Sequence, residues 1–390
     1  MIGNPVQSKT RVALLTPCLG VGGADALILG LSKYAHNLCF TGVAVQQSMN
    51  TQQLEWSNCV NSGIPIHITV DPNHNTKEHK KLHYHKTFID AIWKICRDAD
   101  IVLSWGISDL KSILYNIDLP VIDYIQNASE HYRRIHASNK DVYYPVACSR
   151  AAMIGNCQII YNGIDPGRVT PRLGRDLQRK VWGISNKDKL LLYMGRFVEE
   201  KQPASVIKAL TNLPDWKAVF CGSGPLEKEL YTQAQNYVPG RVFFIKPQYH
   251  VGDLFTSSDV FMLHSQYEGH PLALMEAMLA GIPTVYSDIN CMKELESSFG
   301  PLGVMIPKLA TNEQLSEAVI EASSHTDLAF TRINNARSVV WNNFTLSTIA
   351  WQWEEFIDYC VWDWRKRKRR TEIHPVKPLE LLKEGELDGS

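Results

Sequence analysis

The stretch EGHPLALMEAMLAGIPTV, residues 268–285, predicts a buried helix that leads into a strand. Pro271 suits the first turn of that helix, Gly281 suits the position just after its last turn, and Pro283 would end it. Within the apolar run stands one carboxylate, Glu276. Burying an unpaired polar group costs about 2 to 7 kcal/mol, so Glu276 needs a partner. The partner could be a core arginine or water at the helix edge, or it could be the hydroxyl groups of a ligand.

Short β-branched runs alternate with helical stretches along the chain, which predicts parallel β-α-β units. In the first part the expected strands are RVALLT (11–16), GVAVQQ (42–47), IPIHITV (64–70), DIVLSW (100–105) and PVIDYIQ (120–126). In the second they are KLLLYMG (189–195), WKAVFCG (216–222), RVFFIK (241–246), DVFMLHS (259–265) and PTVYSD (283–288). Helices are expected near 203–211, 225–237, 250–257, 271–280 and 312–323.

A chain of 390 residues is too long for one ordinary core, because single cores stop growing near about 250 to 300 residues. The polar segment PRLGRDLQRKVWGISN, residues 171–186, has no sustained periodicity and separates the two series of strands. We therefore predict an α/β protein with a first domain over 1–170 and a second over 171–349. Residues 371–390 are expected to form a tail.

The charge balance, the apolar runs and the cysteine pattern disfavour several classes of protein. Lys+Arg and Asp+Glu both number 40, so no global positive field favours nucleic acid. The first ten residues lack an apolar core, and no run of about 18 apolar residues occurs, which predicts a cytoplasmic protein. The nine cysteines are scattered without CxxC pairs, against a disulfide framework or a structural zinc site. No DxD stands in a metal-binding context, so no metal is expected.

Three turns carry candidate ligand groups, because ligands of such sheets bind beyond the carboxyl ends of the strands. In LLLYMGRFVEEKQPASVIKAL (190–210), Gly195 ends a strand, and Arg196 and Lys201 follow, suited to a diphosphate or simply solvated. Glu268 and the amides of residues 269–272 would meet a polar, anionic ligand. The turn KPQYH, residues 246–250, is expected near a nucleotide base.

A glycine-rich turn, TPCLGVGGADALI (16–28), follows the first strand. Gly22 and Gly23 would let the backbone approach a phosphate or a sugar closely. The spacing is not a complete GxGxxG, and no acidic residue closes a strand at the offset that a dinucleotide ribose requires. The sequence therefore disfavours a dehydrogenase.

Five motifs together resemble the retaining glycosyltransferases of family 4, over about residues 11–355. They are GVGGAD (20–25), IIYNGID (159–165), LYMGRFVEEKQ (192–202), FCGSGPLEKEL (220–230) and YEGHPLALMEAMLAGIPTVYSD (267–288). The resemblance implies the GT-B architecture, which is two facing Rossmann-like domains with doubly wound parallel sheets. It also implies that a C-terminal helix, 350–370, crosses back to complete the first, acceptor-binding domain.

The resemblance further implies a nucleotide-sugar donor across the second domain. Arg196 and Lys201 would hold its diphosphate, Glu276 its ribose hydroxyls, and Glu268 its sugar, so that Arg196, Lys201 and Glu268 are the catalytic candidates. Many members have a histidine after a first-domain strand, where this chain has Gln126, with His131 five residues on. The other expected substrate-binding residues are Gly22, Gly23, Gly195, Gly222, Gly269, His270, Pro271 and Leu272.

The activity so implied is retaining, metal-independent transfer of a sugar from a UDP-, GDP- or ADP-sugar to a hydroxyl acceptor, which is a glycan, a glycolipid or a small molecule. No cofactor is expected beyond this donor substrate. Two alternatives remain: a nucleotide-sugar-binding scaffold subunit without turnover, and a GT-B nucleotide-sugar epimerase or hydrolase. A scaffold would form no product from the nucleotide sugar, and an epimerase or hydrolase would form one without an acceptor.

Two basic segments suggest a further partner. KEHKKLHYHK (77–86) contains Lys80 and Lys81 and reads as a solvated helix, a basic aromatic helix, or a zinc site. WQWEEFIDYCVWDWRKRKRR (351–370) ends in six basic residues that include Arg365 and Arg369. Either segment is expected to contact an anionic membrane peripherally or to be solvated.

Overall fold

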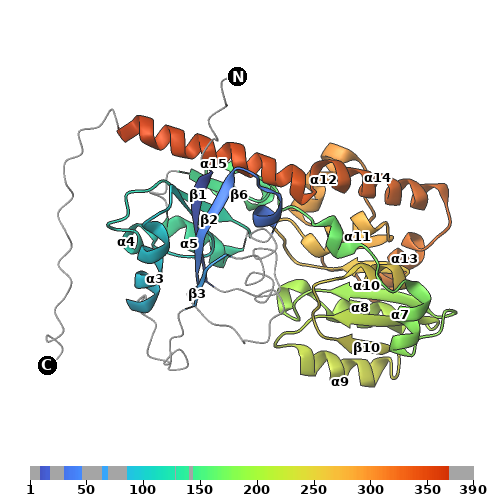
Figure 1. Ribbon diagram of the computed structural model, residues 1–390. Helices are drawn as coiled ribbons and strands as arrows, with labels where there is room; N and C mark the ends of the chain where they lie inside the picture. The colour runs from blue at the N-terminus through green and yellow to red at the C-terminus, as the bar shows by residue number, and fades with distance from the viewer. Residues whose placement is uncertain are drawn as a thin grey trace, which may run out of the picture.

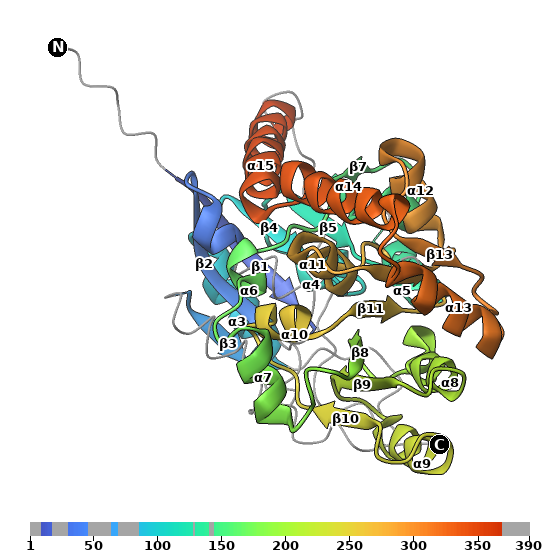
Figure 2. The same ribbon diagram turned by 90° about the vertical axis from the view of Figure 1, so that its right-hand side faces the viewer.

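The computed structural model describes residues 9–17, 30–45, 64–68, 86–127, 129–139 and 144–368. These residues form two α/β domains, each built on a parallel sheet (Figure 1 and Figure 2). The first sheet has the order β3-β2-β1-β4-β5-β6-β7, and the second has the order β10-β9-β8-β11-β12-β13. The predicted pair of Rossmann-like domains is therefore confirmed.

The strands of the first sheet are β1 (Thr10–Thr16), β2 (Leu38–Val45), β3 (Ile66–Ile68), β4 (Ile101–Ser104), β5 (Val121–Ile125), β6 (Tyr144–Ala147) and β7 (Gln158–Ile159). Those of the second are β8 (Lys189–Met194), β9 (Trp216–Cys221), β10 (Val242–Ile245), β11 (Val260–Leu263), β12 (Thr284–Ser287) and β13 (Val304–Ile306). Each of the ten predicted strands has a counterpart: β1 and β2 begin earlier than predicted, at Thr10 and Leu38, and the other eight are shorter than predicted.

In the described part of the first domain, residues 30–34 are helical, and α3 (Lys86–Cys96), α4 (Leu110–Ile113) and α5 (Glu130–Ser138) are followed by a short turn, η1 (Arg150–Ala152), and by α6 (Pro166–Val169). The second domain contains α7 (Arg175–Trp182), a short turn, η2 (Glu199–Lys201), α8 (Ala204–Thr211), α9 (Glu227–Tyr237), α10 (Gly252–Ser257), α11 (Leu272–Ala280), α12 (Asn290–Phe299), α13 (Asn312–Ala322) and α14 (Asp327–Asn343). None of the described helices is both long enough and apolar enough to cross a membrane.

Strand β1 shows how the first sheet is covered on both faces. Val12 and Leu14 point into a core that includes Trp353, whereas Ala13 and Leu15 point into a second core beside α3. Successive side chains of a strand alternate between faces, so a strand buried on both sides reads as a continuous apolar run. This is why RVALLT could be recognised as a strand from its composition.

Helix α15 (Leu346–Lys368) confirms the predicted crossing to the first domain (Figure 1). It begins at Leu346 rather than at residue 350. Trp353 packs edge-on against Tyr124 of β5, with ring centroids 5.0 Å apart. Asp358 accepts a hydrogen bond from Thr10 Oγ1 at 2.7 Å. Apolar packing and polar contacts thus fix this helix to the first sheet.

Segment 171–186 is not irregular as the sequence suggested, because it contains α7. The buried face of this helix is polar: Arg179 is fully buried and donates to the carbonyl oxygen of Ser257 at 2.8 Å and to Asp259 Oδ2 at 2.9 Å. Leu177 and Val181 are exposed instead. Apolar periodicity cannot reveal a helix whose buried contacts are made by an arginine.

The chain crosses between the domains twice, and the two crossings lie side by side. The backbone of Ile164 donates to the carbonyl oxygen of Phe344, and the amide of Leu346 donates to that of Ile164, both at 2.8 Å. A Cβ on Gly163 would lie 2.7 Å from the side chain of Leu346, closer than such contacts allow. Glycine therefore permits the close approach of the two crossings, and the predicted boundary at 170 falls just after α6.

Candidate functional site

Glu276 has a protein partner. It is buried in α11, and its Oε1 accepts a hydrogen bond from Arg168 Nε of α6 at 2.8 Å. The core-arginine alternative is therefore confirmed for the ligand-free protein, and the contact to ribose hydroxyls stays a prediction. Burial raises the pKa of Glu276 above its ordinary value, and the charge of Arg168 opposes that rise.

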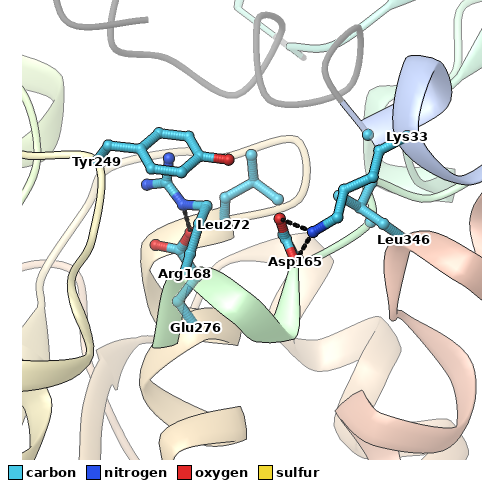
Figure 3. A pocket seen from close by; sticks show the side chains of 9 residues that line it. Lys33, Asp165, Arg168, Tyr249, Leu272, Glu276 and Leu346 are labelled. Carbon is cyan, nitrogen blue, oxygen red and sulfur yellow. Dashed lines mark hydrogen bonds and ion pairs between the residues drawn. The ribbon is translucent and has the colours of Figure 1, made fainter. Parts of the chain in front are cut away.

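Arg168 also contacts the turn that was expected near a base. Its guanidinium carbon lies 4.8 Å from the ring centroid of Tyr249, as Figure 3 shows. A cation over an aromatic face is attracted by the negative charge on that face. Arg168 therefore joins the carboxylate of α11 to the turn that precedes α10.

These groups line a recess between the domains (Figure 3). Across it, Lys33 of the first domain binds Asp165, with Nζ 3.1 Å from Oδ2. Tyr34 donates to Asp165 Oδ1 at 3.0 Å, and Asp165 also caps α6 by accepting from the amide of Gly167. The residues lining the recess are Gly30, Lys33, Gly163, Asp165, Arg168, Tyr249, Leu272, Glu276 and Leu346.

Lys201 and Glu268, predicted from separate turns, meet in the structure. Lys201 Nζ lies 2.5 Å from Glu268 Oε1, which also accepts from Ser265 Oγ at 2.7 Å. Glu268 comes from the loop that leads into α11, so the pair stands beside the amino end of that helix. An ammonium group and a helix amino terminus together favour an anionic ligand.

Arg196 lies in the same turn as Lys201 but is exposed. Its Nη2 is 3.1 Å from Glu200 Oε1. The carbonyl oxygen of Glu200 accepts from the amide of Gln266 at 2.8 Å, which ties this turn to the loop after β11. Arg196 is thus anchored through Glu200 at the edge of the site, while its contact with a diphosphate stays a prediction.

Gly222 is required by packing. A Cβ at this position would lie 2.0 Å from the carbonyl oxygen of Gly195, where the ends of β8 and β9 meet. The distance between the backbones of residues 195 and 222 leaves no room for a side chain on Gly222. The structure therefore gives Gly222 a structural role, whereas a Cβ on Gly195 would come no closer than 3.3 Å to the side chain of Tyr193. The contact of both residues with substrate stays a prediction.

The loop before α11 is fastened to the first domain. Gly269 lies against the carbonyl oxygen of Gln126, since a Cβ on it would be 2.1 Å away. Ser149 Oγ donates to the carbonyl oxygen of Gly269 at 2.7 Å, and Asn162 Nδ2 donates to that of His270 at 3.2 Å. The predicted residues Gln126 and Gly269 therefore come together across the domains.

His270 is buried in this interface. Neither ring nitrogen has a hydrogen-bond partner among the residues that the structure describes. Loss of solvent lowers the pKa of His270 to about 3, so the ring is neutral near pH 7. Its edge contacts with Tyr161 and Phe344, at 5.3 and 5.0 Å between centroids, make it a packing residue of the interface.

The remaining predictions have different outcomes. Pro271 immediately precedes α11 and Leu272 begins it, as the sequence indicated. His131 lies in α5, and its side chain is not described. Within the described ranges, no group of His, Cys, Asp and Glu side chains is arranged to hold a metal ion. Gly22, Gly23, Lys80, Lys81 and Arg369 lie outside the described residues.

Sequence reasoning did not find Lys33, Asp165 or Arg168 as parts of the site. One signal was available: Asp165 ends the motif IIYNGID, and Arg168 follows it by three residues. An acidic cap with an arginine one helical turn later was a candidate partner for the buried carboxylate. The pairing itself joins residues 108 positions apart, which local spacing does not reveal.

Solved structures share this two-domain fold. Anabaena Alr3699/HepE, crystallised with UDP and glucose, aligns over 90% of this chain and 100% of its own with a TM-score of 0.74 at 16% identity. WaaG, a glycosyltransferase of lipopolysaccharide biosynthesis, aligns over 89% of this chain and 99% of its own, with a TM-score of 0.65 and 16% identity. The fold is therefore of the GT-B class.

The family described as glycosyl transferases group 1 matches residues 174–339, which lie in the second domain. The putative teichuronic acid biosynthesis glycosyltransferase TuaC of Bacillus subtilis is 33% identical over 36% of this chain and 34% of its own length. The N-acetyl-alpha-D-glucosaminyl L-malate synthase of Bacillus anthracis is 26% identical over 50% and 52%. The chain thus spans about a third to a half of the length of these relatives. The resemblance to glycosyltransferases found in the sequence is confirmed for residues 174–339.

Replacing Arg168 by Met should lower the free energy of unfolding by about 3 to 5 kcal/mol, because it leaves a buried charge without its partner. Since burial raises the pKa of Glu276, its ionisation opposes folding as pH rises above the ordinary value of 4.5. The loss in Arg168→Met should therefore be larger at pH 8 than at pH 5. Urea denaturation at both pH values measures it.

The double variant Arg168→Met/Glu276→Met is the matched control, since it removes both charges and fills a similar volume. It should recover stability to within about 1 kcal/mol of the native protein. An equal loss in the single and double variants would show that the ion pair is not what the helix requires.

Proposed function

We propose that this chain is a retaining glycosyltransferase that moves a sugar from a nucleoside diphosphate to a hydroxyl acceptor. The observation that carries the proposal is the ion pair of Lys201 and Glu268 at the amino end of α11. Glu268 stands eight residues ahead of the buried Glu276 in the sequence. This arrangement offers a cation for a diphosphate and two carboxylates for hydroxyl groups. The family match in the second domain and the UDP and glucose of the HepE structure support the same class of donor.

In the proposed mechanism, the bond between the sugar and the diphosphate breaks as negative charge grows on the leaving phosphate. Lys201 would exchange its contact with Glu268 for a phosphate oxygen, and Arg196 and the amides before α11 would add to this stabilisation. The acceptor hydroxyl attacks from the face that the nucleotide leaves, which retains configuration, and the leaving phosphate takes its proton. These groups can supply the stabilisation without a divalent metal.

Two other activities fit the same donor site. A scaffold subunit would bind the nucleotide sugar without turnover, and an epimerase or hydrolase would turn it over without an acceptor. The placement of Lys201 and Glu268 at the end of α11 favours transfer over loss of activity. The relatives named for glycosyltransfer in polysaccharide and lipopolysaccharide synthesis favour a glycan or lipid-linked acceptor.

Thermal unfolding with UDP, GDP and ADP in excess chelator tests the donor site. A nucleotide at 100 times its dissociation constant should stabilise the protein by about 2.7 kcal/mol. We expect one nucleotide to do so without metal, with the effect weakened in Glu276→Ala. Stabilisation by none of the three, or only after a metal is added, would contradict the assignment.

Lys201→Met should lower the transfer rate by at least about 100-fold, because one stabilising contact to the leaving group contributes about 3 to 4 kcal/mol in the transition state. Transfer from the nucleotide sugar that stabilises the protein is measured by product formation. Lys228→Met on the exposed face of α9 is the control and should leave the rate unchanged. An unaltered rate in Lys201→Met would rule out its role at the phosphate.

We also propose peripheral contact with an anionic membrane through the exposed aromatic side chains of α15 and the basic residues of its last turn. Trp351, Tyr359 and Trp362 are each at least half exposed along this helix, and Lys366 lies over the ring of Trp362 at 4.6 Å. Exposed Trp and Tyr beside basic groups suit the lipid interface. Arg365, 64% exposed, is close by, although it is paired with Asp100.

The native chain should sediment with phosphatidylglycerol vesicles and not with phosphatidylcholine vesicles, because about 1 kcal/mol is gained per basic residue near an anionic surface. Trp351→Ser/Tyr359→Ser/Trp362→Ser should abolish sedimentation without loss of secondary structure. Equal sedimentation of native and variant chains would contradict the proposed surface.

A further inference from the structure

Arg168 lies between two parts of the recess that the proposed donor site would use. Its Nε binds Glu276 Oε1 at 2.8 Å, and its guanidinium faces Tyr249 at 4.8 Å (Figure 3). We propose that Arg168 is the positioning residue for the nucleoside half of the donor, which holds Glu276 in the orientation that recognises ribose hydroxyls. This inference rests on the proposed function, because it concerns the same nucleotide.

The hydrogen bonding of Glu276 leaves one oxygen for a ligand. Arg168 Nε binds Oε1, whereas Oε2 accepts no hydrogen bond from the part of the chain that the structure describes. Glu276 also lines the recess between the domains. A carboxylate has about four acceptor sites, so the same group can bind an arginine and a pair of hydroxyls. Arg168 therefore does not need to leave when a ribose binds.

Arginine suits this position better than lysine. Its charge favours the ionised form of the buried carboxylate, and its planar group can donate from Nε while its face rests on an aromatic ring. A lysine ammonium would supply the charge, but it could not make the planar contact with Tyr249. The side chain thus sets both the charge and the direction of the Glu276 carboxylate.

Both domains fix the helix that carries Arg168. Asp165 caps α6 through the amide of Gly167 at 2.9 Å, and Lys33 and Tyr34 hold Asp165 from the opposite side of the recess. A helix of four residues has little stability of its own and depends on such contacts. Helix α6 also packs against α10 and α11 of the second domain, and the carbonyl oxygen of Arg168 accepts from the amide of Val251 at 2.9 Å. Arg168 is consequently placed by both domains, although the carboxylate that it holds belongs to the second.

The test is discrimination between nucleotides with and without ribose hydroxyls. Calorimetric dissociation constants are measured for UDP, ADP and GDP, each beside its 2′-deoxy and 3′-deoxy forms, with the native full-length chain and with Arg168→Met. Loss of one hydroxyl should weaken native binding about tenfold, the effect of a hydrogen bond to a charged group. The ratio of the dissociation constant of a deoxy form to that of its ribonucleotide is thus about ten for the native chain. In Arg168→Met this ratio should fall below about threefold.

Two further variants separate positioning from a merely structural role. Arg168→Lys keeps a charge near Glu276 and is the variant to use if Arg168→Met does not fold; its ratio should also fall. Tyr249→Leu removes the aromatic face on which the guanidinium rests but leaves the hydrogen bond to Glu276, so its ratio should fall part of the way toward that of Arg168→Met. A structural defect alone would not change discrimination between two nucleotides that differ by one oxygen.

The outcomes are distinct. If the native chain binds a ribonucleotide and the ratio is reduced in either Arg168 variant, the inference is supported. An unchanged ratio in a folded Arg168 variant overturns it and leaves the proposed function intact. If none of the three nucleotides binds the native chain, the proposed function fails, and the role of Arg168 fails with it.

Discussion

The buried ion pair of Arg168 and Glu276 is the constraint on which the arrangement of the cleft depends. A carboxylate in the apolar core of a helix is tolerated only beside a compensating charge. Here that charge comes from α6, the short helix between the two domains, which Asp165 fastens to the first domain. The second domain therefore completes its own core only when the connection is correctly placed. Folding of the cleft and ionisation of its carboxylate are coupled in this way.

Close backbone contacts impose the same geometry without charge. Gly163 admits the side chain of Leu346, Gly222 admits the carbonyl oxygen of Gly195, and Gly269 admits that of Gln126. At each place a Cβ would overlap a neighbouring atom, so the chain segments meet more closely than any side chain would allow. Two of these contacts lie between the domains or their connections. Gly269, which the sequence indicated as a ligand-binding position, thus also helps to set how the domains face each other.

The sequence revealed more of the second domain than of the first. Pro271 and Gly281 defined α11 correctly because they act locally, and the apolar strands were clear because both sheet faces are covered. The partner of Glu276 could not be predicted, because it depends on a contact between residues far apart in the chain. Helix α7 was missed for a related reason, since Arg179 makes its buried contacts through hydrogen bonds rather than apolar packing.

The candidate phosphate site was predicted as residue types, and the structure adds that its cations already have partners. Lys201 is held by Glu268, and Arg196 is held by Glu200. In the ligand-free protein these carboxylates keep the cations in place and limit their attraction for singly charged anions. A diphosphate carries more negative charge than one carboxylate, and it can also reach the amides before α11, so it can compete for Lys201 where a simple anion would not. The same exchange would release Glu268 toward a neutral hydroxyl-bearing group. Binding of the diphosphate and readiness of the carboxylate for a sugar would then be two results of one displacement.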